Sequence, residues 1–318
     1  MSAWGPIDAV LQPAGPVAQT IAEMAWVLFA GGGLVFAIVM TALVWALRRR
    51  RQASADMGRD AGTLVWIVGA GLVFPVVVLS ALLVYAVWRT PGLTPTRDAQ
   101  DLVISVTGHL WWWEVRYSDP ASGLDVVLAN QIHLPVGRAV TMGLSSADVI
   151  HSFWVPALAG KIDMVPGRVH QLRLQADRAG VYRGQCAEFC GEQHARMAMH
   201  VVVQAPEAFE RWLAAQAQPA QAPRDGMARR GAQVFAEQRC SACHSVRGLG
   251  PTASIGPDLT HVGSRLHLAA GTLPMSAASL RDWVAHPQRS KPGARMPSYE
   301  RLDDASLAAL VAFLEHLQ

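Results

Sequence analysis

The fold is decided by residues 186–197, which read Cys-Ala-Glu-Phe-Cys-Gly-Glu-Gln-His-Ala-Arg-Met. Two thiols, an imidazole and a thioether fall within this short stretch, and soft sulfur together with imidazole is a ligand set that suits copper. A second imidazole, His151, lies upstream. The separation leaves room for two strands and their turns, so a β-barrel could return His151 to the same rim as Cys186 and Cys190.

Two other interpretations of this cysteine pair remain open. A disulfide between Cys186 and Cys190 is common in extracellular domains. A zinc site would use two thiolates and two imidazoles, although zinc has no place for the thioether of Met197. The combination of ligand types favours copper over both.

The residues around this stretch indicate an all-β domain. Residues 101–106, 124–128 and 169–174 alternate, imperfectly in the last case, between apolar and polar side chains, and turn-forming residues recur between them. Short strands at this spacing predict a sandwich or a barrel. A short helix is expected at 206–215.

The N-terminal part predicts a two-helix membrane hairpin. Residues 24–47 and 61–88 contain no charged side chain, and a helix of about 20 residues crosses a hydrocarbon core of about 30 Å. Pro75 is expected to kink the second helix. The four arginines at 48–51 place the connecting turn in the cytoplasm, and therefore the rest of the chain on the outer face.

The composition agrees with a membrane protein. Hydrophobic residues make up 51% of the chain and charged residues only 16%. The net charge is +3, and there is no long basic patch with interleaved aromatic residues. We therefore expect membrane lipid, and no nucleic acid, among the partners.

A second metal motif lies near the C-terminus. Residues 240–244 read Cys-Ser-Ala-Cys-His, the signature of covalent c-type haem attachment. Met296 offers a sixth ligand, and Met275 is its rival for that position. A redox or zinc motif built from the same cysteines is the alternative. Helices are predicted on both sides of the motif, at residues 227–238, 277–285 and 304–317.

These observations predict a membrane-anchored multidomain chain. Its parts are an N-terminal segment with the transmembrane hairpin (1–90), an all-β copper domain (91–213), a linker (214–226) and an all-α haem domain (227–318). The alanine, glutamine and proline residues of the linker are typical of a flexible, semi-extended chain.

Residues 186–197 resemble the CuA loop of cytochrome c oxidase subunit II. Residues 111–117 (Trp-Trp-Trp-Glu-Val-Arg-Tyr) and 161–168 (Lys-Ile-Asp-Met-Val-Pro-Gly-Arg) are similar to other stretches of that subunit, as is the helix pair. The resemblance covers roughly residues 15–213 and implies a cupredoxin-type Greek-key barrel. Residues 227–318 resemble a class I cytochrome c, and the order of the parts resembles subunit II of the caa-type oxidases.

The resemblance implies a CuA centre of two copper ions. By residue-by-residue correspondence its ligands are bridging Cys186 and Cys190, then His151 and Met197 on one copper, and His194 and the Glu188 carbonyl on the other. The Glu188 side chain matches the family's ligand to magnesium at the border with subunit I. Trp111 matches the aromatic residue through which electrons enter the copper site, although a tryptophan in a strand can equally be a core residue.

The cytochrome resemblance implies a haem c. Cys240 and Cys243 hold it covalently, and His244 and Met296 are its axial ligands, a pairing that raises the potential. Pro257 is expected to set its carbonyl against the other ring nitrogen of His244.

Together the resemblances imply the electron-accepting subunit of a respiratory terminal oxidase in the bacterial cell membrane, with the copper and haem domains on the periplasmic side. Electrons pass from cytochrome c or another donor through haem c and CuA to the haem centres of subunit I. There oxygen is reduced to water with proton pumping, and subunit III is a further expected partner. A CuA-containing nitric oxide reductase, a free-standing membrane-tethered electron carrier and a copper storage or delivery protein are the alternatives.

The sequence departs from the family pattern at two places. Residues 61–88 lack the glutamate that members often carry near the start of the second helix, and Asp60 is the nearest substitute. Beside Trp111, the residues Trp112, Glu114 and Val115 stand where tyrosine, serine and tyrosine are common.

Overall fold

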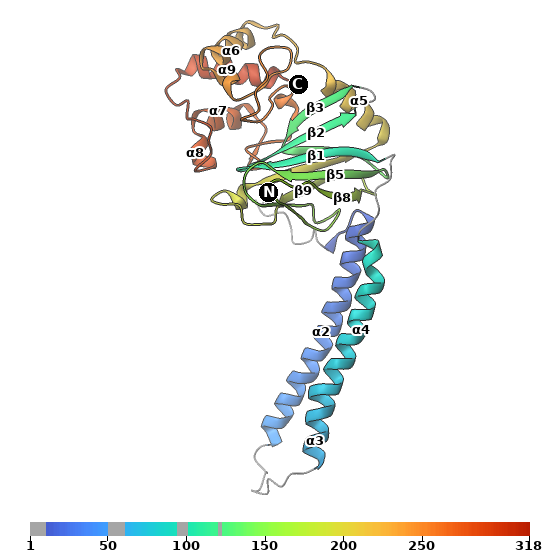
Figure 1. Ribbon diagram of the computed structural model, residues 1–318. Helices are drawn as coiled ribbons and strands as arrows, with labels where there is room; N and C mark the ends of the chain where they lie inside the picture. Colours follow the sequence, from blue (N-terminus) through green and yellow to red (C-terminus); the bar gives the residue numbers. More distant parts are fainter. Residues whose placement is uncertain (1–10, 50–60, 94–100, 120–122) are drawn as a thin grey trace. The chain divides into compact units, whose positions relative to one another are not determined.

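The computed structural model describes residues 11–49, 61–93, 101–119 and 123–318 (Figure 1). The chain forms two compact units: residues 19–95 make up one, and residues 1–18 together with 96–318 make up the other. Asp60, the expected substitute for the missing glutamate, and the last two of the four arginines lie outside the described residues.

Two long apolar helices form the first unit. Helix α2 spans Pro16–Arg49, while α3 (Ala61–Val68), a π-helical turn η2 (Gly69–Val73) and α4 (Phe74–Arg89) run on from one another. The most apolar 18-residue stretches of residues 16–48 and 64–89 have mean hydropathies of 2.4 and 2.7, and both ranges are long enough to cross a membrane. Figure 1 shows α2 and α4 side by side. Glu23 of α2 and Arg89 of α4 form an ion pair. The exposed leucine, valine, phenylalanine and tryptophan side chains of these helices suit lipid rather than water.

The turn η2 lies directly before Pro75. A proline lacks a backbone N–H, and its ring collides with the carbonyl group four residues back in a regular helix. Here the N–H of Phe74 bonds to the carbonyl of Gly69, five residues back, at this junction. The wider turn lets the helix continue past the proline.

The second unit begins with two five-stranded sheets. The first has the order β3-β2-β1-β5-β8 and the second has the order β4-β10-β9-β6-β7. The strands of the first are β1 (Leu102–His109), β2 (Trp112–Asp119), β3 (Leu124–Ala129), β5 (Ala139–Ser146) and β8 (His170–Gln175). Those of the second are β4 (Gln131–Pro135), β6 (His151–Trp154), β7 (Ile162–Met164), β9 (Gly180–Cys186) and β10 (Ala198–Gln204). The pairs β1–β5 and β4–β10 are parallel and the other pairs are antiparallel. The predicted cupredoxin-like β-fold is confirmed.

Alternation along the strands builds the core between the sheets. In β2 the side chains of Trp113, Val115 and Tyr117 are fully buried, while those between them are partly exposed. The buried Tyr117 hydroxyl donates to the His133 carbonyl (2.9 Å) and accepts from the His133 N–H (2.7 Å), so no polar atom of that side chain is left without a partner.

Strand register places the copper-ligand candidates at one end of the second sheet. Strand β6 begins at His151, and β9 ends at Cys186. These two strands are antiparallel neighbours that pair Phe153 with Cys186. The start of one therefore meets the end of the other at the same rim.

The C-terminal part is helical, as predicted. Its helices are α6 (Gly226–Glu237), α7 (Ala277–Ala285), α8 (Pro287–Ser290) and α9 (Asp304–His316), with a small hairpin of β11 (His267–Leu268) and β12 (Leu273–Pro274). Asp225, Ser276 and Asp303 cap the starts of α6, α7 and α9 with side-chain oxygens that accept backbone N–H groups. Aliphatic and aromatic residues from α6, α7 and α9 form the core of this part.

The segment predicted as a flexible linker is bound to the C-terminal part. Helix α5 (Pro206–Ala217) continues into it, because alanine and glutamine favour helix. Beyond the helix, the N–H of Ala220 donates to the Arg247 carbonyl (2.8 Å), and Nε2 of His261 lies 3.0 Å from the Gln218 carbonyl oxygen. Ala220 is buried in the hydrophobic core. These contacts hold residues 218–220 against the C-terminal part, and composition does not reveal them. The flexibility of the linker stays a prediction.

Candidate metal centres

The first candidate centre gathers the sulfur and imidazole groups of two segments. The Sγ atoms of Cys186 and Cys190 are 3.8 Å apart. Nδ1 of His151 lies 3.9 Å from Cys186 Sγ, while Nδ1 of His194 and Sδ of Met197 lie 3.6 and 3.8 Å from Cys190 Sγ. Ligand atoms of His151, Cys186 and Cys190 all lie within 4.8 Å of one another.

This spacing fits thiolates that share metal ions. Two sulfurs that each lie about 2.3 Å from one metal at a tetrahedral angle are about 3.8 Å apart. A disulfide needs a sulfur–sulfur distance of about 2.05 Å, and all four cysteines are free. The thioether of Met197 at the same cluster is a donor for copper rather than zinc.

The two thiols of the cluster change each other's protonation. Interaction with the Cys190 thiol, and then with His151, lowers the pKa of Cys186. The neighbouring Cys186 sulfur in turn raises the pKa of Cys190, so the two thiols do not lose both protons easily without a positive ion between them. Cys186, Cys190 and Met197 are buried, which keeps water out of the cluster.

Asp148 orients His151. Its Oδ1 lies 2.8 Å from His151 Nε2, and its Oδ2 accepts the N–H of Leu110 at 2.8 Å. This leaves Nδ1 of His151 directed at Cys186. Carboxylate–imidazole pairs of this kind set the tautomer and ring orientation of metal-ligating histidines. Burial by itself lowers the pKa of His151, but its bonds to Cys186 and Asp148 outweigh burial and raise the pKa.

Gly108 makes room for the same ring. A Cβ atom at this position would lie 2.7 Å from Cδ2 of His151. Sequence reasoning assigned no role to Asp148 or Gly108. The signal for Asp148 was its place three residues before His151, but only the fold shows that the turn brings the two side chains together.

The backbone carbonyl of Glu188 lies beside the sulfur cluster. Its carbonyl oxygen lies 3.2 Å from Cys186 Sγ, which agrees with the expected ligand role of that carbonyl. Its carboxylate lies 3.6 Å from Lys161 Nζ and is partly exposed. Magnesium binding by that carboxylate stays a prediction.

Trp111 lies against the copper-site loop. Its indole Nε1 donates to the carbonyl of Cys190 at 2.9 Å. A Cβ atom at Gly191 would lie 3.2 Å from Trp111 Cζ2, so the glycine allows this close approach. Of the three consecutive tryptophans only Trp113 is a fully buried core residue, while Trp111 and Trp112 are half-buried.

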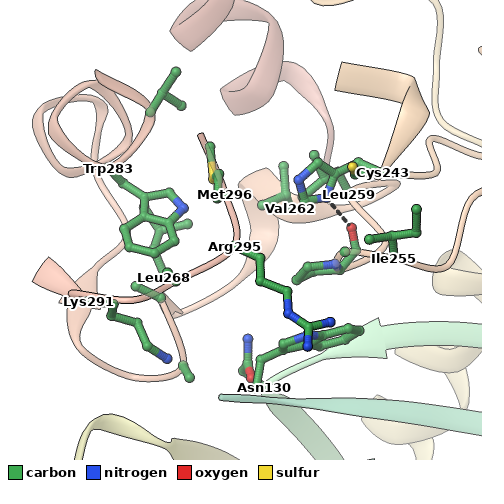
Figure 2. Close-up of a pocket in the computed structure, with 18 of the residues that line it drawn as sticks. Asn130, Cys243, Ile255, Leu259, Val262, Leu268, Trp283, Lys291, Arg295 and Met296 are labelled. Atoms are coloured by element: carbon green, nitrogen blue, oxygen red, sulfur yellow. Dashed lines mark hydrogen bonds between the residues drawn. The ribbon is translucent and has the colours of Figure 1, made fainter. Parts of the chain in front are cut away.

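The second candidate centre is a cavity in the C-terminal part. Cys240, Cys243, His244 and Met296 line it, together with apolar residues that include Leu259, Val262, Leu268, Leu280, Val284 and Leu314. Figure 2 shows Cys243 and Met296 on separate segments around this space. An apolar cavity with two thiols, an imidazole and a thioether on its walls fits a haem c.

One ring nitrogen of His244 is hydrogen-bonded to the backbone. Its Nδ1 lies 2.7 Å from the carbonyl oxygen of Pro257, as the sequence predicted. Burial lowers the pKa of His244, so the ring is neutral and its Nε2 is free to bind a metal. A Cβ atom at Gly256 would lie 2.8 Å from Cε1 of this ring, so only glycine fits beside it.

Met296 and Met275 differ in their surroundings. Both methionines pack against the hydrophobic core, but only Met296 lines the cavity. This favours Met296 as the sixth ligand.

Residues of the β-domain also line the cavity. They include His109, Trp111, Trp112 and Asn130, and from the C-terminal part Lys291 and Arg295 join them. In Figure 2 the guanidinium group of Arg295 extends towards the side of the cavity where Asn130 lies. Sequence reasoning predicted neither this shared wall nor a role for Lys291 and Arg295.

Two family models match the chain. The periplasmic domain of cytochrome c oxidase subunit II matches residues 121–205, and cytochrome c matches residues 228–318. Cytochrome c oxidase subunit 2 of Alkalihalophilus pseudofirmus is 33% identical over 97% of this chain and 90% of its own length. The subunit of the same name from Bacillus subtilis is 26% identical over 98% of this chain and 92% of its own. The crystal structure of the periplasmic domain of subunit II of cytochrome oxidase from Bradyrhizobium japonicum is 29% identical, covers 38% of this chain and 96% of its own, and has a TM-score of 0.36.

Fold and sites together define a membrane-anchored electron-transfer protein with a cupredoxin-like domain and a cytochrome c domain. The chain belongs to the cytochrome c oxidase subunit II family, in the form that is fused to a cytochrome c domain. It is therefore part of an oxidoreductase complex and a partner of subunit I. The family implies CuA copper and haem as its cofactors.

Proposed function

We propose that this chain carries electrons from a c-type cytochrome, through haem c and CuA, to the haem centres of subunit I. Reduction of oxygen to water and proton pumping take place in that partner. The copper and haem parts lie on the periplasmic side of the bacterial membrane, and subunit III completes the complex. The parts are those expected from the sequence: 1–90, 91–213, 214–226 and 227–318.

The observation that carries this proposal is the position of Trp111. Its indole N–H is bonded to the carbonyl of Cys190 in the copper site, and its own carbonyl accepts from Lys291 beside the haem cavity (2.5 Å). One residue is therefore in contact with the walls of both candidate centres. This supports Trp111 as the residue through which electrons reach the copper.

The copper site follows the assignment made from the sequence. Cys186 and Cys190 would hold both copper ions, and His151, His194, Met197 and the carbonyl of Glu188 would complete the ligand set. Shared thiolates spread one electron over two metals, so geometry changes little on reduction. Burial of His151, Cys186, Cys190 and Met197 favours fixed ligand positions in both states. The Glu188 carboxylate is proposed for magnesium.

Cys240 and Cys243 would hold the haem covalently, and His244 and Met296 would bind its iron. Bound haem supplies a one-electron iron couple, whose potential a histidine–methionine pair raises. Pro257 fixes the orientation of His244, and the aliphatic wall excludes water from the cavity.

The test is the composition and activity of the purified complex. We expect two coppers in the CuA site and one haem c for each copy of this chain, a delocalised mixed-valence spectrum, and oxygen consumption with a reduced c-type cytochrome. One copper per chain, or a colourless zinc site, would contradict the CuA assignment. Consumption of nitric oxide instead of oxygen would identify a nitric oxide reductase. Purification in mild detergent without a larger haem-bearing subunit would identify a free-standing carrier.

Covalent attachment has a separate test. In the wild-type chain haem stays with the polypeptide after acid–acetone extraction, because two thioethers hold it. Cys243→Ala leaves at most one link, and we expect an altered haem absorption spectrum. An unchanged spectrum with two thioethers at other residues would contradict the assignment.

A further inference from the structure

The loop before Met296 is bonded to the loop that carries the copper-ligand candidates. Arg196 donates to the carbonyl of Ser290 at 2.6 Å, and Gln193 donates through Nε2 to the carbonyl of Pro292 at 2.8 Å. Gln193 is buried. We call residues 290–293 the methionine-side loop and residues 191–196 the copper-side loop. The copper-side loop includes His194, and the methionine-side loop ends three residues before Met296.

Lys291 joins the methionine-side loop to Trp111. Its Nζ donates to the Trp111 carbonyl at 2.5 Å, and the side chain is only 4% exposed. Burial lowers the pKa of Lys291 to about 7, and an amine can donate this bond whether it is charged or neutral. A buried amine with a specific backbone acceptor is a structural contact rather than a solvated surface charge.

Gly293 sets how closely the two loops approach. Its φ of +79° is one that residues with a side chain rarely adopt. A Cβ atom there would also lie 2.6 Å from Oε2 of Glu192 and 3.5 Å from Cη2 of Trp111. The backbone conformation therefore favours glycine, and an added Cβ would displace the carboxylate of Glu192 from this point of contact.

We propose that Lys291 and Gly293 are positioning residues that hold the methionine-side loop against Trp111 and the copper-side loop, so that one electron passes from ferrous haem, which becomes ferric, to the oxidised copper pair while the two domains stay docked. The inference rests on the proposed function for its electron path. The docking contact itself stands on the hydrogen bonds, burial and glycine geometry given above. No bond is broken and no proton moves in this step.

The first test compares Gly293→Ala with Gly137→Ala in the purified oxidase complex. Gly137 has a similar φ of +75° but no atom within 4 Å of a Cβ, so its variant shares the backbone strain without the clash. We expect amide hydrogen exchange in both loops to become faster in Gly293→Ala and to stay unchanged in Gly137→Ala. Electron transfer from haem c to CuA after photoinjection should slow by roughly tenfold. A displacement of reacting groups by about 1 Å can slow a reaction by up to about a hundredfold, and we expect a smaller displacement here.

The second test compares Lys291→Met with Arg289→Met. Arg289 is exposed and lies two residues away, so its variant removes a neighbouring cation without touching the copper domain. Lys291→Met leaves the Trp111 carbonyl without its donor, and we expect the same faster exchange and slower transfer. The midpoint potentials and absorption spectra of both centres should stay as in the wild type, which separates a positioning role from damage to either site.

Wild-type exchange and wild-type transfer rates in both Gly293→Ala and Lys291→Met would overturn the proposal. A strong dependence of the wild-type transfer rate on ionic strength would also overturn it, because a docked pair does not need an encounter steered by surface charge. Hydrogen exchange reports on the docking alone. Failure of the proposed function appears instead as a wild-type complex without CuA or haem c signals.

Discussion

Asp148 holds the one copper-ligand candidate that is distant in sequence from the others. His151 reaches the cluster from strand β6, while the other candidates come from residues 186–197. The Asp148 carboxylate binds both His151 and the N–H of Leu110. Burial raises the pKa of Asp148, but hydrogen bonds from His151 and from backbone N–H groups together outweigh burial and lower it, so the carboxylate is ionised and acts as an acceptor.

Asp148→Asn should weaken copper binding. The amide has the size of the carboxylate but lacks its charge, and the loss of such an outer partner typically costs about 10–100-fold in metal affinity. Copper content after dialysis against a graded competitor measures this. Asp125→Asn is the control, because Asp125 is exposed and pairs with Arg116 on another part of the barrel. Equal copper retention in both variants would remove Asp148 from the site.

Met197→Leu should keep the copper and change its potential. Leucine has a similar volume, so the buried position is filled at little cost to stability. The loss of a sulfur donor favours the reduced state, and we expect a rise of roughly 60 mV, which is tenfold in equilibrium for one electron. Redox titration of the mixed-valence band measures it. An unchanged potential would remove Met197 from the ligand set.

Two kinds of element carry the two centres. The copper site lies on loops anchored by strands, and β6 and β9 are held in register within the second sheet. The haem cavity depends instead on how helices pack. Helices α6 and α9 cross at Gly231, where a Cβ atom would lie 1.9 Å from the Ala309 carbonyl oxygen.

Gly231→Ala should destabilise the haem domain without changing the copper site. The added methyl group meets backbone that cannot turn away, and overpacking of this kind costs about 1–3 kcal/mol. Gly226→Ala is the control, because its nearest neighbour is the flexible end of Arg229 at 3.8 Å. Denaturant titrations followed by haem absorption measure the difference. Equal denaturation midpoints for the two variants would contradict the prediction, because α6 and α9 would then accommodate the added methyl group without loss of stability.

At the scale of the whole molecule, the copper and haem parts share one compact unit. Besides the two loops, β10 and the β11 hairpin are in contact. The N–H of Ala198 donates to the Ala270 carbonyl (3.0 Å), and the rings of His200 and His267 stack with centroids 3.9 Å apart. Several separate contacts therefore hold the haem cavity beside the copper-side loop.

Removal of copper should separate the two halves of the electron path. The core between the sheets is built mainly from apolar side chains that do not bind metal. The fold should therefore survive chelation, and the far-ultraviolet circular dichroism spectrum should stay unchanged. We expect the external donor still to reduce haem c, while oxygen consumption stops because the path to subunit I is cut. Readdition of copper should restore activity. Full activity in a copper-free complex would contradict the path.

The residue types and spacings of residues 186–197 and 240–244 were enough to predict copper and haem chemistry, because ligand identity is a local property of a segment. Hydrophobic runs and strand alternation likewise predicted the hairpin and the β-domain, because the spacing of apolar residues along a segment shows which face of a helix or strand avoids water. The roles of Asp148, Lys291 and Gly293 could not be predicted. They depend on which strands become neighbours and on which loops of two domains touch, and such contacts between distant residues exist only once the chain has folded.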